Sequence, residues 1–263
     1  MWTPKIPFLQ PKEPAIEYRV PAPTVFPNVA GGHIAALYKA ARSGGDFYDL
    51  VLTGSRLVFV LLDISGQRQE ALHIATHVQD AFRAEVPKLF GDQSANEAEG
   101  LTDLLLTLNR TIINAASGPH FSAGFLACYS LDLGTLFYIN AGHTPALLKD
   151  SSGITVLEAT ALPLGLFSHA TQDAQMCVLE PGATLLLVSR GIIESRQRRR
   201  EFGLQKVREV LEKKPFHDPH QLCAVTLAAV QEFANGKSSE NDLTTLALVR
   251  PAVAASLTAS AGS

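Results

Sequence analysis

The stretch "SGGDFYDLVLTGSRLVFVLLDISG", residues 43–66, contains two apolar runs joined by a short Gly-Ser turn. Each run has the length and composition of a β-strand, so the stretch predicts an antiparallel hairpin. Asp46 and Asp49 open the first run and Asp63 closes the second, so strand pairing should bring these carboxylates near one another. A carboxylate at the end of a buried strand is costly without a partner, which makes a bound cation the economical explanation.

The hairpin is open to more than one interpretation. Hard divalent ions such as Mg²⁺ and Mn²⁺ prefer oxygen ligands of this kind, so the acids favour such an ion. Taken alone, "GGDFYD" at 44–49 also fits a tight turn with a capped strand. The triplet "GGD" begins the signature of nucleotide cyclases, but the acid and Phe that should follow are missing.

Composition describes one globular domain in 263 residues, with 46% hydrophobic and 18% charged residues. The net charge of -3 gives no general attraction to nucleic acid or anionic membrane. The longest apolar run, "LVFVLL" at 57–62, is far too short for a membrane span. Three distant cysteines, at 128, 177 and 223, form no CxxC pair, which disfavours zinc and disulfides. We therefore expect a cytoplasmic protein.

The chain divides by composition into three parts. Residues 1–29 form a Pro-rich arm with seven prolines, which either wraps the domain or meets a partner, or is a disordered leader. Residues 30–250 form the folded domain. Residues 251–263 are small and polar and predict a flexible tail.

Secondary-structure patterns predict the α+β class. Many short β-type runs are separated by Gly, Asp or Ser turns such as "LDLGT" at 131–135, as in antiparallel sheet. Helical patterns interrupt them in two blocks, at about 67–88 with 98–116 and about 203–213 with 219–235. Asp218 followed by Pro219 is typical of a helix start. Strands and helices in separate blocks indicate a layered sandwich.

Seven blocks now follow in order: "ARSGGDFYDLV", "VFVLLDISGQR", "FSAGFLACYSLDLGTLFYINAGHTPALL", "LPLGLF", "GATLLLVSRGIIES", "REFGLQKVREVL" and "NDLTTLALVR". Over residues 30–250 this series resembles the SpoIIE/RsbU branch of the metal-dependent protein phosphatases (PPM, type 2C). The resemblance implies an α-β-β-α sandwich with a two-metal centre, which hydrolyses phosphoserine or phosphothreonine by a metal-bound water without a phosphoenzyme. In many members the substrate is an anti-sigma-factor antagonist of the STAS type.

The resemblance also implies roles for individual residues. Asp63 matches the carboxylate that bridges both metals. The Ile64 carbonyl matches a second ligand of the first metal. Asp46 matches the acid that holds that metal's waters, with Asp49 close behind. The second metal should be held by the Asp of a "TDG" block and the first Asp of a "DDIT" block. This chain instead has Arg190 and Asn241 at those positions.

These departures put the second metal in doubt. Arg190 is always charged and would project toward the cation that it replaces. Strand alternation should send Asn241 and Asp242 to opposite faces, so only a bulge or an alignment slip would let Asp242 substitute. Arg68 stands where "DxSGxG" members have glycine, and it would stiffen or redirect the turn after Asp63. Our hypothesis is that Arg190 occupies or covers the second site; the alternative is that it points to solvent beside a decayed site.

The expected function is therefore a SpoIIE/RsbU-like serine/threonine phosphatase domain with one Mn²⁺ or Mg²⁺ and weak activity. The alternative is an inactive pseudophosphatase that binds a phosphoprotein or a small regulatory protein without turnover. Either role is regulatory signalling, with no nucleic-acid partner, and a homodimer is left open.

Three further features carry weaker signals. "SRQRRREF" at 195–202 places four arginines together, as in an anion-docking patch or a solvated loop. His73 and His77 have zinc-compatible spacing but no third ligand, which favours helix packing. His143 in "NAGHTP" matches the family's "AGH" block and is expected at the edge of the site, in a structural role or as a general acid.

Overall fold

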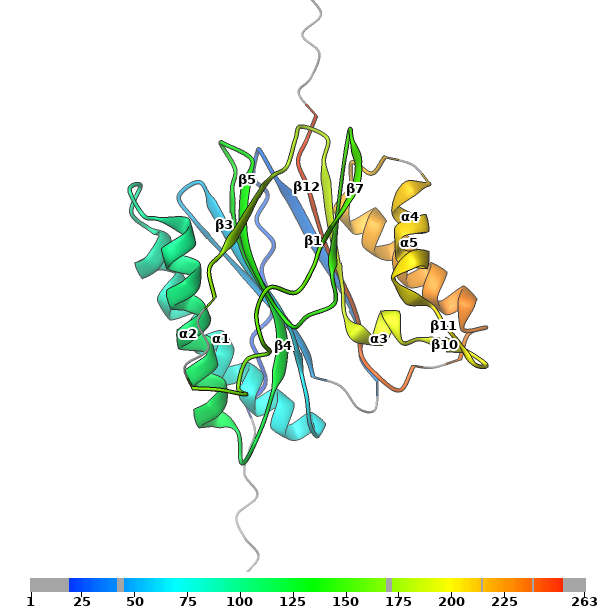
Figure 1. Cartoon of the computed structure of the whole chain (residues 1–263), viewed down its shortest axis with the longest axis horizontal. Coiled ribbons are helices and arrows are strands. Elements are labelled where there is room, and N and C mark those ends of the chain that lie inside the picture. The colour runs from blue at the N-terminus through cyan, green and yellow to red at the C-terminus, as the bar shows by residue number, and fades with distance from the viewer. Residues whose placement is uncertain (1–18, 42–44, 169–171, 214, 238, 253–263) are drawn as a thin grey trace, which may run out of the picture.

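The computed structural model of the chain describes residues 19–41, 45–168, 172–213, 215–237 and 239–252. Its centre is a pair of five-stranded antiparallel sheets that face each other (Figure 1). The first sheet has the order β2-β3-β4-β5-β8, with bounds Asp46–Thr53, Arg56–Ile64, Ser122–Ser130, Thr135–Ala141 and Gln175–Val178. The second has the order β1-β12-β9-β6-β7, with bounds His33–Lys39, Leu243–Val249, Thr184–Val188, Ala146–Asp150 and Gly153–Leu157.

Two helices cover the outer face of each sheet (Figure 1). On the first sheet lie α1 (Arg68–Phe90) and α2 (Glu97–Ala115), and on the second lie α4 (Gly203–Glu212) and α5 (Pro219–Phe233). A short helix, α3 (Arg190–Ile193), and a two-stranded ribbon of β10 (Arg196–Gln197) and β11 (Arg200–Glu201) connect β9 to α4. The predicted α+β sandwich with helix, sheet, sheet and helix layers is confirmed.

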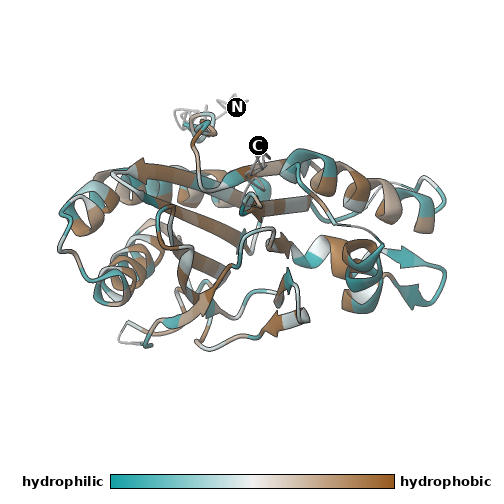
Figure 2. Ribbon diagram, turned by 90° about the horizontal axis from the view of Figure 1, so that it is seen from above, coloured by the Kyte–Doolittle hydropathy of each residue, from teal (hydrophilic) through white to brown (hydrophobic). Residues whose placement is uncertain are grey.

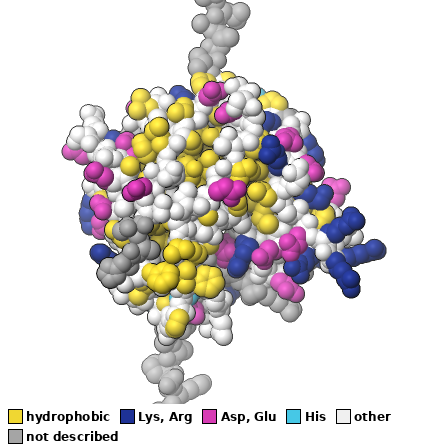
Figure 3. Space-filling model, in the orientation of Figure 1, with side chains coloured by type: hydrophobic (Ala, Val, Ile, Leu, Met, Phe, Trp, Pro, Cys, Tyr) yellow, Lys and Arg dark blue, Asp and Glu magenta, His cyan; other side chains and the backbone are white. Residues whose placement is uncertain are grey.

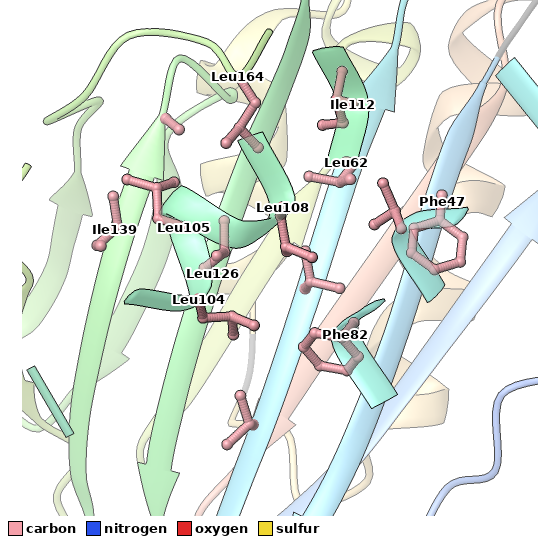
Figure 4. Close-up of a cluster of buried hydrophobic side chains, with 14 of the residues drawn as sticks. Phe47, Leu62, Phe82, Leu104, Leu105, Leu108, Ile112, Leu126, Ile139 and Leu164 are labelled. Atoms are coloured by element: carbon pink, nitrogen blue, oxygen red, sulfur yellow. The ribbon is translucent and has the colours of Figure 1, made fainter. Parts of the chain in front are cut away.

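Apolar side chains form three buried layers. One lies between the two sheets, and one lies between each sheet and the helices that cover it. Figure 4 shows the layer between the first sheet and its helices, where Phe82 and Leu108 meet Leu62 and Leu126. The strands of both sheets are mainly brown in Figure 2, as expected for strands covered on both faces.

Alternation along β3 fixes the direction of its last carboxylate. Val58, Val60 and Leu62 face the helices, whereas Leu57, Phe59 and Leu61 face the second sheet. Asp63 continues the second series and therefore faces the space between the sheets. Packing of β3 in the core therefore directs the Asp63 side chain into the space between the sheets, at the end of the strand.

The four predicted helices are confirmed within a few residues, including the Asp218 cap, whose side chain accepts a hydrogen bond from His220 N. The strand β7, the ribbon and α3 were not predicted. Residues 19–29 of the predicted arm lie along α1 and β2, where Ala22 and Gln79 exchange hydrogen bonds of 2.6 and 2.9 Å. Residues 1–18 of the arm and 253–263 of the tail lie outside the described residues. In the part of the chain that the structure describes, no helix is both long and apolar enough to cross a membrane.

Candidate active site

One end of the sandwich carries a pocket of about 210 Å³ that gathers most of the predicted site residues. The hairpin β2–β3, the start of α3 and the segment before β12 meet there. Its lining residues are Asp46, Asp63, Ile64, Ser65, Gly66, Arg190, Gly191, Asn241 and Asp242. A larger pocket of about 450 Å³ adjoins it, but the carboxylates of the hairpin lie in the smaller one.

Asp46 and Asp63 are paired across β2 and β3, which confirms that the hairpin brings them together. Burial raises the pKa of Asp46 to about 7, against the opposing effect of hydrogen bonds from Ser189 and Thr244. The Thr244 hydroxyl lies 2.5 Å from Asp46 Oδ2. Burial also raises the pKa of Asp63, although the Arg190 guanidinium lowers it. For both acids, the effect of burial therefore outweighs that of these partners.

Arg190 contacts one member of this pair, Asp63. It is the first residue of α3, and its Nε lies 3.2 Å from Asp63 Oδ2. The side chain is 51% exposed, so the guanidinium lies at the opening of the pocket with one face in solvent. A second carboxylate, Glu194, lies 4.0 Å from the same Nε. Arg190 thus forms an ion pair with the acid that the family resemblance assigns to both metals.

Asp242 also lines the pocket, which corrects the strand-alternation argument. Both Asn241 and Asp242 precede β12, which begins at Leu243, so the alternation of a strand does not separate them. The Tyr38 hydroxyl and the Ala41 amide donate hydrogen bonds of 2.8 and 2.7 Å to the Asp242 carboxylate.

Arg68 completes the environment of Asp242. Its Nη1 lies 3.7 Å from Asp242 Oδ1 and donates a hydrogen bond of 3.1 Å to the Ala41 carbonyl. Burial and the neighbouring Asp242 carboxylate raise the pKa of Tyr38 to about 12, so the phenol stays a hydrogen-bond donor. Arg68 therefore links the backbone of Ala41 to Asp242 in the pocket wall.

Asp49 lies elsewhere, and its expected place beside the metal is corrected. The side chain is fully buried on the helix-facing side of β2, because positions 47 and 49 share a face opposite to that of Asp46. Arg83 of α1 donates to it at 2.6 and 3.0 Å, and Thr24 Oγ1 donates at 3.0 Å. Asp49 is therefore part of a structural ion pair.

His143 is not among the residues that line the pocket. The side chain is buried, with Nδ1 3.0 Å from the Thr144 carbonyl and Nε2 without a hydrogen-bond partner in the described structure. Burial lowers the pKa of His143 to about 4. The neutral ring and its position favour the structural role over that of a general acid.

Three contacts at the site were not predicted from the sequence. Thr244 donates a hydrogen bond to Asp46, Ser189 donates one to the Asp242 carbonyl, and Tyr38 donates one to the Asp242 carboxylate. Thr244 stands in the "NDLTTLALVR" block, so its place in that block was a usable signal. Tyr38 is 204 positions from Asp242 in the chain, and no local pattern connects the two. His73 and His77 pack edge to face on α1 with ring centroids 4.5 Å apart.

Part of the pocket lining has the chemistry of a site for a hard cation. Asp46, Asp63 and the Ile64 carbonyl offer oxygens of the kind that Mn²⁺ and Mg²⁺ prefer. Among the described residues no three His, Cys, Asp or Glu side chains are grouped as a metal site. The positions that the family resemblance assigns to a second ion carry the guanidinium of Arg190 and the amide of Asn241, and the Asp242 carboxylate lines the same pocket.

The two facing sheets, their outer helices and the acidic pocket define the scaffold of a PPM-type serine/threonine phosphatase. The profile of the Stage II sporulation protein E (SpoIIE) family matches residues 53–251, and the chain belongs to that family.

Relatives of known sequence or structure agree with this assignment. Protein IcfG of Synechocystis sp. is 27% identical over 211 residues, covering 72% of this chain and 33% of that protein. Phosphoserine phosphatase RsbP of Bacillus subtilis is 25% identical over 165 residues, covering 61% and 40%. The crystal structure of the RsbU and RsbW domains of Rv1364c from Mycobacterium tuberculosis matches with a TM-score of 0.67 at 25% identity, covering 85% of this chain and 61% of that one. The chain spans only a third to two fifths of the two curated relatives.

Proposed function

We propose that this chain is a regulatory domain of phosphatase fold that binds a phosphoprotein and hydrolyses it weakly or not at all. The contact between Arg190 and Asp63 carries this proposal, because a permanent cation lies against the acid that relatives use to bridge two metals. As the family resemblance implies, the partner is a small STAS-type regulatory protein carrying phosphoserine or phosphothreonine.

The charge balance supports a second metal position that is occupied by the Arg190 guanidinium in place of an ion. Replacing two carboxylates by one guanidinium and one amide changes the local charge by about +3, comparable to the charge of a divalent ion. Arg190 pairs with Asp63 and Arg68 pairs with Asp242, so two of the three pocket acids already have a cation. A guanidinium at the pocket opening also suits bidentate binding of phosphate oxygens. The pocket can therefore hold a phosphoryl group without a second ion.

A single-ion phosphatase is the second candidate, favoured by the retained oxygens of Asp46, Asp63 and Ile64. These groups would hold one Mn²⁺ or Mg²⁺, which when bound would polarise water and neutralise phosphate charge. Loss of the second ion's electrostatic stabilisation typically costs several kcal/mol in the transition state, so turnover would be slower by about a hundredfold or more.

Restoring the missing acids tests the proposal. We expect the double variant Arg190→Asp with Asn241→Asp to gain Mn²⁺-dependent hydrolysis of a phosphoserine peptide, by about a hundredfold over the native chain. Calorimetry with Mn²⁺ should show at most one ion bound to the native chain and two to the variant.

The matched control is the double variant Arg110→Asp with Asn96→Asp on α2, which changes the net charge by the same amount. Asn96 is the N-cap of α2, and Asp caps a helix as well as Asn does. Native turnover at the rate of the double variant, or two ions bound to the native chain, would refute the proposal.

A further inference from the structure

The ribbon β10–β11 is the most basic feature of the described surface. Arg196, Arg198, Arg199 and Arg200 fall within five positions, and all four are exposed. Dark-blue side chains gather over this ribbon at the right edge of Figure 3, and the ribbon is teal in Figure 2. Arg196 pairs with Glu201 at 2.6 Å, whereas the other three form no ion pair with any described residue. A chain of net charge -3 thus concentrates free positive charge at one place.

The ribbon holds these arginines in a defined position. Arg196 pairs with Glu201 and Gln197 with Arg200 across the two strands. The Gln197 side chain bonds to Asn235 after α5 at 3.2 Å, and the Phe202 amide donates to the Ser195 carbonyl at 2.8 Å. Because Phe202 is buried in the apolar layer under α4 and α5, the ribbon is anchored at its base. The cluster is therefore a structured element and not a loose solvated loop.

A pocket of about 450 Å³ connects the ribbon to the candidate active site. Arg196 lines it together with two further cations, Lys39 and Lys237. Gly191 and Asn241 line both this pocket and the smaller acidic one. A ligand can thus extend from the arginines to the active site along one surface.

We propose that the ribbon and this pocket bind an acidic segment of the phosphoprotein partner, next to its phosphorylated residue. This proposal deepens the proposed function, since it names the chemistry by which the partner is recognised. Charge complementarity carries it: Arg196, Lys39 and Lys237 line the pocket that adjoins the active site. The three exposed arginines that follow on the same ribbon, at positions 198, 199 and 200, add positive charge beside it.

The carboxylates of the larger pocket favour a peptide over nucleic acid. Glu194 and Glu240 line this pocket together with its cations. A peptide supplies backbone N–H donors to such carboxylates, whereas a nucleic-acid backbone presents only anionic acceptors and would be repelled. The mixed lining therefore selects an acidic segment that also carries hydrogen-bond donors.

Fluorescence anisotropy with defined peptides tests this surface on the full chain. The probes are a labelled Asp/Glu-rich dodecapeptide with a central phosphoserine and the same peptide with serine. The ribbon variant carries Arg198→Glu, Arg199→Glu and Arg200→Glu. The matched control carries Arg19→Glu, Lys88→Glu and Arg110→Glu, which changes the net charge equally on exposed positions away from the ribbon. We expect the ribbon variant to bind both peptides about tenfold more weakly, and the control to change binding by less than about threefold.

The two peptides separate this inference from the proposed function. If the ribbon variant binds the unphosphorylated peptide as tightly as the native chain does, the ribbon inference is wrong. Tighter binding of a single-stranded oligonucleotide or of phosphatidylserine vesicles than of the peptides also overturns it. If phosphoserine adds no affinity to either protein but the ribbon variant is still weakened, the ribbon inference stands and the proposed phosphoprotein site fails.

Discussion

At the scale of single residues, the two arginines that depart from the family pattern each pair with an acid of the active site. Arg190 contacts Asp63 at 3.2 Å and Arg68 approaches Asp242 at 3.7 Å. An arginine cannot lose its charge, so these pairs persist at any pH where the acids are ionised. The chain itself therefore supplies a cation to two of the three acids of the pocket.

Asp49 gives the sharpest test of which acids belong to the site. We expect Asp49→Asn to lower the free energy of unfolding by about 2 kcal/mol, because it removes the charge that Arg83 and Thr24 bond to. Its affinity for Mn²⁺ should equal that of the native chain. Urea denaturation and calorimetry measure the two quantities.

Asp63→Asn is the matched control for Asp49→Asn. This variant should lose Mn²⁺ affinity with little loss of stability, since Asp63 is partly exposed and its pKa is raised by burial. If Asp49→Asn binds Mn²⁺ more weakly than Asp63→Asn does, Asp49 is a metal ligand and its assignment to a structural ion pair is wrong.

At the scale of elements, the short helix α3 sets the position of Arg190. It follows β9 directly, and Ser189 at its start bonds to the backbone of Asp242 and Thr244. Gly191 allows this close packing, because a Cβ there would lie 2.0 Å from the Asp242 carbonyl oxygen. Two segments that are distant in the chain are thus held together beside the pocket.

Gly191→Ala should disrupt this packing. We expect a loss of about 2 kcal/mol in the free energy of unfolding, since the backbone of Asp242 must move to admit a methyl group. Gly118→Ala is the control, because a Cβ at position 118 meets no atom within 4 Å. Thermal unfolding of both variants measures the effect, and equal stability of the two would contradict the packing argument.

At the scale of the whole molecule, periodicity was enough to predict the layers but not every contact of the site. The alternation in β3 and the hairpin with β2 placed Asp46 beside Asp63 from local pattern alone. Asp49 was misplaced because proximity in sequence hid the opposite direction of its side chain. Tyr38 reaches Asp242 only through the pairing of β1 with β12, which no short-range signal reports.

The same layering buries His143 and makes the stability of the whole domain depend on pH. Its pKa is about 4 in the folded chain and about 6.5 in an unfolded one, so the unfolded state binds the extra proton between these values. His143 therefore destabilises the fold as pH falls from about 6.5 to about 4, by up to about 3 kcal/mol. Asp46 acts in the opposite sense, because its pKa is raised to about 7 and its protonation favours the folded state.

A variant isolates the contribution of His143 from that of Asp46. His143→Asn keeps a donor for the Thr144 carbonyl but cannot be protonated in this range. We expect the variant to be less stable than the native chain at pH 7.5, where a cavity is its main effect, and the difference to shrink steadily toward pH 4.5. Urea denaturation at four pH values measures it. A difference that stays constant across that range would mean that His143 is protonated as easily in the folded chain as in the unfolded one.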